Sequence, residues 1–224
     1  MFRFTRNVAI AALLLLAPSA FAWNADPKKD SNCEHLSQIQ KDADQENSEA
    51  QTQLGWEYFL GKCLQQNTDK AKTLLSLAAA SENVKAMALL GVIYHRENED
   101  AQAIKWAQLA ADHGDGGGES LLGWLYYLGK GAPKNDAAAL KWAHLAADKG
   151  IAGGQSLLGM MYEYGSGGLS KDYVEADKWY ILASKSESDN TTLVSTKRLL
   201  EDGMTAESRQ EAQQRADSWK PLHN

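Results

Sequence analysis

After residue 22, the sequence lacks an apolar run long enough to cross a membrane. It also lacks a basic surplus, with 23 Lys and Arg against 29 Asp and Glu, which argues against a nucleic-acid-binding protein. The motifs Gly-x-Ser-x-Gly and His-Glu-x-x-His are missing, and no two of the five histidines have metal-ligand spacing on one expected helix. We therefore expect no enzyme, no metal site and no cofactor.

The first 22 residues have the pattern of a secretory signal. Arg3 and Arg6 form a basic start, Val8 to Leu16 is a short apolar run, and Ala20-Phe21-Ala22 has the small-x-small pattern of a cleavage site. We predict cleavage after Ala22, with a retained signal anchor as the alternative. Cleavage leaves 21 basic against 29 acidic side chains, a net charge of −8, which would attract a basic partner surface.

A Leu-Gly pair recurs four times, and a tyrosine follows each glycine after three residues. The pairs are Leu54-Gly55, Leu90-Gly91, Leu122-Gly123 and Leu158-Gly159, and the tyrosines are Tyr58, Tyr94, Tyr126 and Tyr162. A second anchor follows in each unit, with an alanine four residues later; the anchors are Leu74, Trp106, Trp142 and Trp179. The glycine and tyrosine rows are best explained by close helix packing.

The spacing of these anchors predicts stacked pairs of helices. The distance from a second anchor to the next glycine is always 17 residues, whereas the distance from a glycine to its own second anchor is 19, 15, 19 or 20 residues. Contacts between units are thus kept constant while the internal loop varies, as a stacked helical array requires. In the best-preserved unit, we expect Asp136 to cap the second helix and Gly150 to end it.

The units also contain the patterns A-x-A/S-x-x-L-G-x-x-Y-x-x-G-x-G and D-x-x-x-A-x-x-W-x-x-x-A-A-x-x-G, with which the sequence resembles the Sel1-like repeats, relatives of the tetratricopeptide repeats. The resemblance implies an all-α fold, an α-solenoid of about four units of stacked antiparallel helix pairs over residues 47–186. The first unit departs from the pattern at Cys63 and Leu74, and the second unit lacks the glycine loop between Tyr94 and Asn98.

Capping helices are expected at both ends of the repeats. Residues 23–46 should comprise a mobile segment and a helix from Cys33 to about Asp44, and residues 187–224 should comprise two helices, the second capped by Thr205. An even cysteine count in an exported chain favours a disulfide between Cys33 and Cys63, with free thiols or a catalytic cysteine as alternatives. We interpret the glycine-rich segment 113–118 as a junction loop and not as a phosphate site.

In helix-pair arrays the first helix of each unit normally lines a concave binding face. The candidate partner-binding residues are therefore those one and four positions after the repeat glycines, since large aromatic side chains dominate protein contacts. They are Trp56, Phe59, His95, Trp124, Tyr127, Met160 and Glu163. The competing interpretation is that the row one position after the glycine is buried between units.

The resemblance implies a non-enzymatic, monomeric protein-binding solenoid in the periplasm, with another protein on its concave face. Its role could be that of an adaptor, a regulator or an inhibitor, and some family members are immunity proteins against phospholipases of the type VI secretion system. The alternative is a cell-wall or β-lactam hydrolase of the cysteine-rich Sel1-like type. The sequence favours neither nucleic acid binding nor membrane insertion after signal cleavage.

Overall fold

The computed structural model describes residues 33–187 and 190–222, and within these ranges the chain forms eleven α-helices, one short 3₁₀ helix and no strand. The predicted signal and its cleavage site lie outside the described residues. None of the described helices is both long enough and apolar enough to span a membrane. The chain divides into two compact units, an N-terminal unit up to Gly118 and a C-terminal unit from Glu119, which are described separately below.

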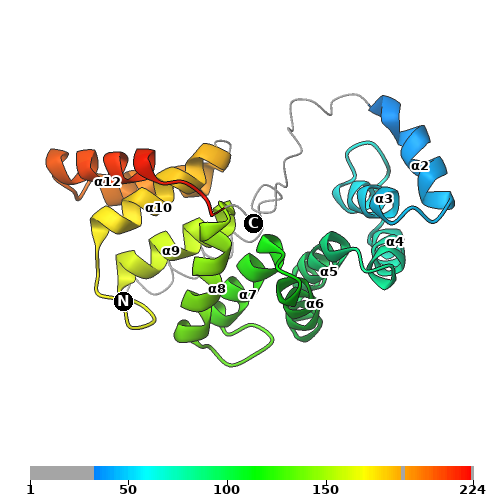
Figure 1. The fold of residues 1–224 in the computed structure, drawn as a ribbon, viewed down its shortest axis with the longest axis horizontal. Coiled ribbons are helices and arrows are strands. Elements are labelled where there is room, and N and C mark those ends of the chain that lie inside the picture. Colours follow the sequence, from blue (N-terminus) through cyan, green and yellow to red (C-terminus); the bar gives the residue numbers. More distant parts are fainter. Residues whose placement is uncertain (1–32, 188–189, 223–224) are drawn as a thin grey trace. The chain divides into compact units, whose positions relative to one another are not determined.

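The N-terminal unit is a stack of antiparallel helix pairs, as the repeats predict (Figure 1). Neighbouring helices pack in order along the chain, with α3 on α4, α4 on α5 and α5 on α6, and α2 packs on α3 at the end of the stack. The elements are η2 (Cys33–His35), α2 (Leu36–Asp44), α3 (Ser48–Leu60), α4 (Thr68–Ala80), α5 (Val84–Arg96) and α6 (Asp100–Asp112).

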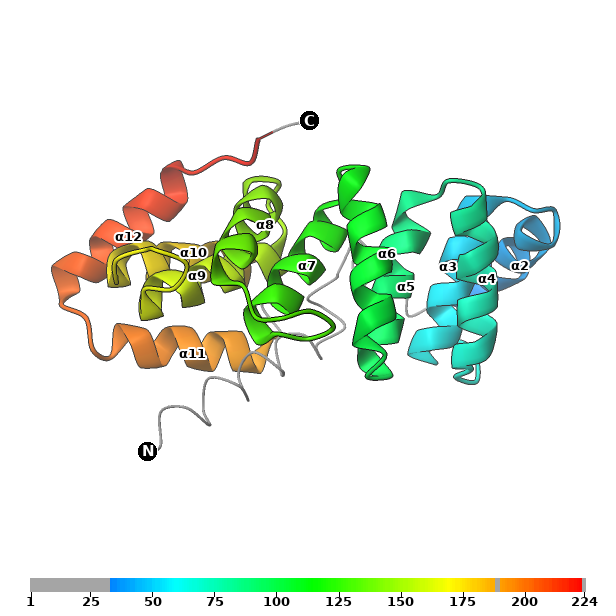
Figure 2. The ribbon, with the colours of Figure 1, turned by 90° about the horizontal axis from the view of Figure 1, so that it is seen from below.

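The C-terminal unit continues the same construction and ends in two further helices (Figure 2). Helix α8 packs on α9 and α9 on α10, while α10 also contacts both α11 and α12. The elements are α7 (Gly116–Leu128, whose first turn belongs to the N-terminal unit), α8 (Asp136–Asp148), α9 (Ala152–Tyr164), α10 (Tyr173–Ser186), α11 (Thr191–Glu201) and α12 (Ala206–Ser218). The predicted α-solenoid fold is thereby confirmed.

Asparagine caps five of the eleven described α-helices. The side chains of Asn47, Asn67, Asn83, Asn135 and Asn190 each accept a hydrogen bond from the backbone N–H three residues later. Such a cap satisfies one of the free N–H groups of the first turn. The prediction that Asp136 caps α8 was wrong by one residue, whereas Thr205 caps α12 as predicted.

The repeat glycines lie where two helices approach closely. A Cβ atom added to Gly55 would lie 3.0 Å from Leu75 Cγ, and one added to Gly123 would lie 2.9 Å from Leu157 Cδ2. A side chain at either position would force the neighbouring leucine to move, which supports the packing explanation for both glycines. The predicted junction loop 113–118 is shorter than expected, because residues 116–118 already form the first turn of α7.

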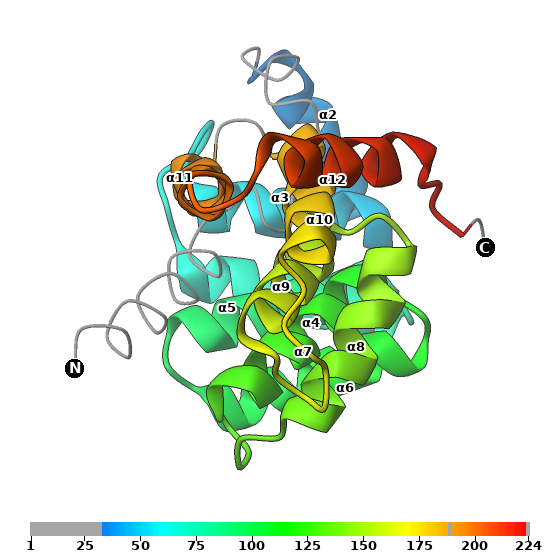
Figure 3. The ribbon, with the colours of Figure 1, turned by 90° about the vertical axis from the view of Figure 1, so that its left-hand side faces the viewer.

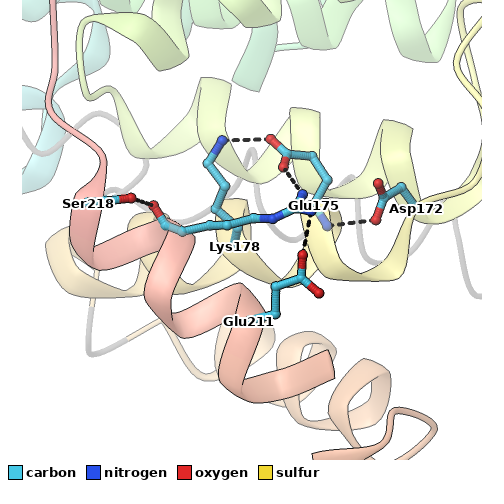
Figure 4. Close-up of polar contacts among 6 residues, drawn as sticks. Asp172, Glu175, Lys178, Glu211 and Ser218 are labelled. Carbon is cyan, nitrogen blue, oxygen red and sulfur yellow. Dashed lines mark hydrogen bonds and ion pairs between the residues drawn. The ribbon is translucent and has the colours of Figure 1, made fainter. Parts of the chain in front are cut away.

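At the C-terminal end, α12 crosses α10 and is held there by ionic and aromatic contacts (Figure 3). Arg215 of α12 donates to Glu175 of α10 at 3.0 Å and to Glu211 at 2.7 Å, and Glu175 also accepts from Lys178 (Figure 4). The indole rings of Trp179 and Trp219 meet edge to face, 6.0 Å apart. Beyond α12, the Leu222 N–H donates to the Asp148 carbonyl oxygen at 2.7 Å, so the chain continues onto α8 of the preceding repeat.

The structure joins Cys33 to Cys63 in a disulfide, the pairing predicted from the sequence, with 5.7 Å between the Cα atoms. The bond connects the short helix η2 to the loop between α3 and α4. Both cysteines of the sequence are consumed, so the alternatives of free thiols and of a catalytic cysteine do not apply to this structure. A disulfide is typical of an oxidising, exported location.

Candidate protein-binding site

Three of the predicted partner-binding residues, Phe59, Trp124 and Met160, belong to the core. Trp124 and Met160 are each 1% exposed, and Val92 at the equivalent position of the second unit is also buried. The Trp124 indole N–H donates to the Gly153 carbonyl oxygen at 3.0 Å, so this side chain ties α7 to α9. The row one position after the repeat glycine is therefore buried in three of four units, as the competing interpretation held, and only Trp56 is partly exposed.

Three residues in the N-terminal unit form what we call the aromatic–arginine cluster: Trp56 and Phe59 on α3 and Arg96 at the end of α5. The two rings stack with 5.1 Å between centroids and 30° between planes. The Arg96 guanidinium carbon lies 5.4 Å from the Phe59 centroid. Phe59 is buried, so the surface of the cluster consists of the partly exposed Trp56 ring and the exposed Arg96.

The cluster combines the side chains best suited to bind another protein. Trp and Arg are the residues most enriched at the energetic centres of protein interfaces. A cation held over an aromatic face is attracted to the ring quadrupole, so Arg96 is ordered before a partner arrives and loses less side-chain entropy on binding. The site can thus offer a flat apolar surface beside a donor-rich guanidinium group.

Two side-chain contacts join the C-terminal end of α5 to α6 and α4. His95 Nδ1 lies 2.6 Å from Oδ1 of Asp100, the first residue of α6, and both side chains are mostly buried. Lys72 donates to Glu97 at 2.7 Å, and this hydrogen bond raises the pKa of the lysine. His95 therefore supports the end of α5 and offers little surface to a partner.

In the C-terminal unit, the predicted Tyr127 and Glu163 lie in one polar cluster with Tyr180. The Tyr180 hydroxyl donates to Glu163 at 3.0 Å, and complete burial raises the pKa of Tyr180 well above its usual value. Burial also raises the pKa of Tyr127, against a hydrogen bond to Ser166 that lowers it. Glu163 is thus occupied in holding α10 against α9, and both tyrosines remain protonated over the physiological range.

Arg96 is the contact residue that the sequence patterns did not indicate. The available signal was the missing glycine loop of the second unit, in the segment Tyr94–Asn98. With this loop absent, the end of α5 and the charge of Arg96 lie close to the preceding helix pair. Among the described residues no group of three or more His, Cys, Asp or Glu side chains is placed to hold a metal ion.

Comparison with known proteins agrees with this architecture. The Sel1 repeat family model matches residues 48–83, 84–115, 118–151 and 152–188. Because these matches cover more than half of the sequence, the chain belongs to the Sel1 repeat family, whose repeats generally mediate protein interactions. Among proteins with curated descriptions, none matches the chain.

Solved structures of Sel1 repeat proteins resemble the chain over most of its length. One is a protective antigen present in uropathogenic Escherichia coli strains that displays an SLR fold, with a TM-score of 0.70 and 30% identity over 93% of this chain and 44% of the antigen. Another is a Sel1 repeat protein from Oxalobacter formigenes, with a TM-score of 0.65 and 25% identity over 84% of this chain and 77% of that protein. This chain thus spans less than half of the antigen.

Proposed function

We propose that this protein is an exported, non-enzymatic binding module that holds another protein through the aromatic–arginine cluster. The observation that carries the proposal is the exposed Arg96 over the ring of Phe59, which in turn stacks on Trp56, a composition typical of an interface centre. Sel1 repeats supply a rigid helical support for such a cluster. The disulfide and the signal-like first 22 residues support a periplasmic location.

The charge distribution favours a basic partner. Residues 33–118 contain 7 basic and 13 acidic side chains, whereas residues 119–224 contain 12 basic and 14 acidic ones. Most of the negative charge therefore belongs to the unit that bears the cluster. A basic protein surface would be attracted to this unit and would associate faster at low ionic strength.

The first test is to capture partners with the mature protein, residues 23–224, from a periplasmic extract of its own host. The proposal expects one protein in stoichiometric amount that is lost when Trp56 and Arg96 are both changed to Ala. Tyr173→Ala is the matched control, because this aromatic residue is 49% exposed on α10. If capture is the same for the double variant and the control, the cluster is not the binding site.

A more specific form of the proposal is an inhibitor, such as an immunity protein against a secreted phospholipase. A small, acidic, exported protein suits the neutralisation of a toxin by direct binding. The decisive test is to send a lipase encoded beside this gene to the periplasm of a host that lacks the protein. Restored growth with the wild-type protein but not with the Trp56/Arg96 double variant would support this role, and growth arrest in both cases would favour an adaptor or regulator.

A further inference from the structure

One leucine recurs on the second helix of every repeat, three residues after the second anchor. We call these residues the second-helix leucines; they are Leu77, Leu109, Leu145 and Leu182. The first three are exposed by 52%, 39% and 38%, whereas Leu182 is only 6% exposed. The same apolar side chain therefore recurs at one surface position of three repeats, and the fourth repeat shows how it can be covered.

Leu182 is covered because α12 crosses α10 at this place. Two ion pairs flank the crossing, from Glu175 to Arg215 and from Lys185 to Asp217. Leu182 lies seven residues after Glu175 and three residues before Lys185. These spacings place the three side chains on one side of α10. The facing side of α12 has the small, buried Ala212 and Ala216, which allow the two helices to approach closely.

The equivalent face of α4 is open. Leu77 borders a hollow of about 550 Å³ that is also lined by Asp69, Lys72, Thr73, Ser76 and Tyr94. Thr73 and Ser76 are exposed, so no described segment of the N-terminal unit covers this face as α12 covers α10. Leu77 is the most exposed of the second-helix leucines and has the largest apolar surface available to a partner.

The hollow is lined by charges of both signs, Asp69 and Lys72, so the charge criterion for the partner comes from the repeat position that decides the contact of α10 with α12. Lys70 of α4 occupies the repeat position of Glu175 in α10, because each lies seven residues before the second-helix leucine of its own repeat. Glu175 receives Arg215 of α12, so a helix seated in the same way on α4 needs an acid in place of Arg215. Lys70 is exposed, with its ammonium group 5.2 Å from the Tyr58 ring.

We propose that the α4 face around Leu77 binds an amphipathic helix of another protein that resembles α12 but carries a Glu or Asp in place of Arg215. Its small residues would cover Leu77, and its acid would pair with Lys70. A second copy of this chain does not fit, because its own α12 presents Arg215 and would be repelled by Lys70. The proposal concerns a different face from the aromatic–arginine cluster and does not depend on it.

The test uses synthetic peptides of residues 204–222, one with the natural sequence and one with Arg215→Glu, titrated into the mature protein and followed by fluorescence anisotropy. We expect the Arg215→Glu peptide to bind about fivefold more tightly than the natural one, because a repulsion with Lys70 becomes an attraction. Lys70→Glu in the protein should reverse this order. Leu77→Lys should weaken binding of the Arg215→Glu peptide by about tenfold or more.

The matched control is Leu199→Lys, because Leu199 on α11 has the same exposed fraction of 52% but no counterpart among the second-helix leucines. Unchanged binding by the control, together with the reversed preference of Lys70→Glu, establishes the site. The proposal is overturned if the Arg215→Glu peptide does not bind up to about 1 mM. It is also overturned if Lys70→Glu leaves the order of the two peptides unchanged, or if Leu199→Lys weakens binding as much as Leu77→Lys.

Discussion

The Tyr180 hydroxyl donates a hydrogen bond to the Glu163 carboxylate at 3.0 Å, and the whole Tyr180 side chain is buried between α9 and α10. The ring is close to the backbone of α9, since a Cβ atom added to Gly159 would lie 2.7 Å from Tyr180 Cε1. The equivalent residues in the second and third repeats are Ala107 and Ala143. The last repeat thus joins its helices through a buried tyrosine where the preceding two use a small residue.

Tyr180→Phe should lower the free energy of unfolding by about 1–2 kcal/mol, because it removes this hydrogen bond and leaves the Glu163 oxygen without its donor. Urea denaturation followed by circular dichroism measures the change. Tyr173→Phe is the control, since Tyr173 is exposed, and should have little effect. Equal stability of Tyr180→Phe and the wild type would show that the hydrogen bond adds nothing.

Asp177 predicts a pH dependence of stability. Its carboxyl group is fully buried and neither oxygen has a hydrogen-bond partner. Its pKa is raised to about 6, mainly by burial and also by Glu201, while Lys197 and Arg209 act in the opposite direction. Because the folded protein holds the proton more tightly than the unfolded chain, with its pKa near 4, this group's contribution is greatest below pH 4 and falls until the pH exceeds 6.

Asp177→Asn should remove this fall and stabilise the protein at pH 7 by at most roughly 3 kcal/mol, the value of a shift of about two pKa units. Thermal unfolding between pH 4 and pH 8 measures it, with Asp202→Asn as a control at an exposed acid on the adjoining turn. If the unfolding temperature of the wild type depends on pH in the same way as that of Asp177→Asn, Asp177 is not the cause of the pH dependence.

Glu82 should be replaceable by glycine with a gain in stability. It lies in the turn after α4 with a φ of +59°, at the place where Gly114 and Gly150 follow α6 and α8 with φ of +78° and +80°. Left-handed backbone is strained for a residue with a side chain, and Glu82→Gly removes this strain. Glycine also makes the unfolded chain more flexible, which offsets part of the gain. The free energy of unfolding should therefore rise by up to about 1 kcal/mol. The reciprocal Gly150→Glu should lose at least as much; a loss of stability in Glu82→Gly would refute the explanation.

The disulfide should stabilise the N-terminal unit. Its cysteines are 30 residues apart, and closing such a loop restricts the unfolded chain by about 3–4 kcal/mol in the chain-entropy model. We expect a reducing agent to lower the urea midpoint of the wild type. The Cys33→Ser/Cys63→Ser variant should already have the lower midpoint and should not respond. A wild-type midpoint that does not change on reduction would contradict this contribution.

The repeat fold could be predicted from the sequence because each unit repeats the same local signals. The constant distance of 17 residues between second anchor and next glycine indicated which helices stack, and helix α12 begins directly after the predicted cap Thr205. Helix starts were less certain, since Asn135 and Asp136 are both good capping residues and only the backbone geometry distinguishes them.

The candidate site was harder to predict, because it depends on how each helix is rotated about its axis. Residues one and four after a repeat glycine are neighbours on the helix, yet Trp124 is buried while Tyr127 is partly exposed. Arg96 was signalled only by the missing glycine loop of the second unit, and Asp177 carried no repeat signal. Their roles follow from packing, which places one over Phe59 and the other among α10, α11 and α12.

The most direct test of the central claim is the affinity of the captured partner for Arg96→Glu and Trp56→Ala, measured by titration calorimetry beside the control Tyr173→Ala. If the aromatic–arginine cluster is the centre of the interface, each cluster variant should weaken binding by about tenfold or more, while all three proteins keep the wild-type helicity. Wild-type affinity in both cluster variants would contradict the account and would place the protein-binding site elsewhere on the molecule.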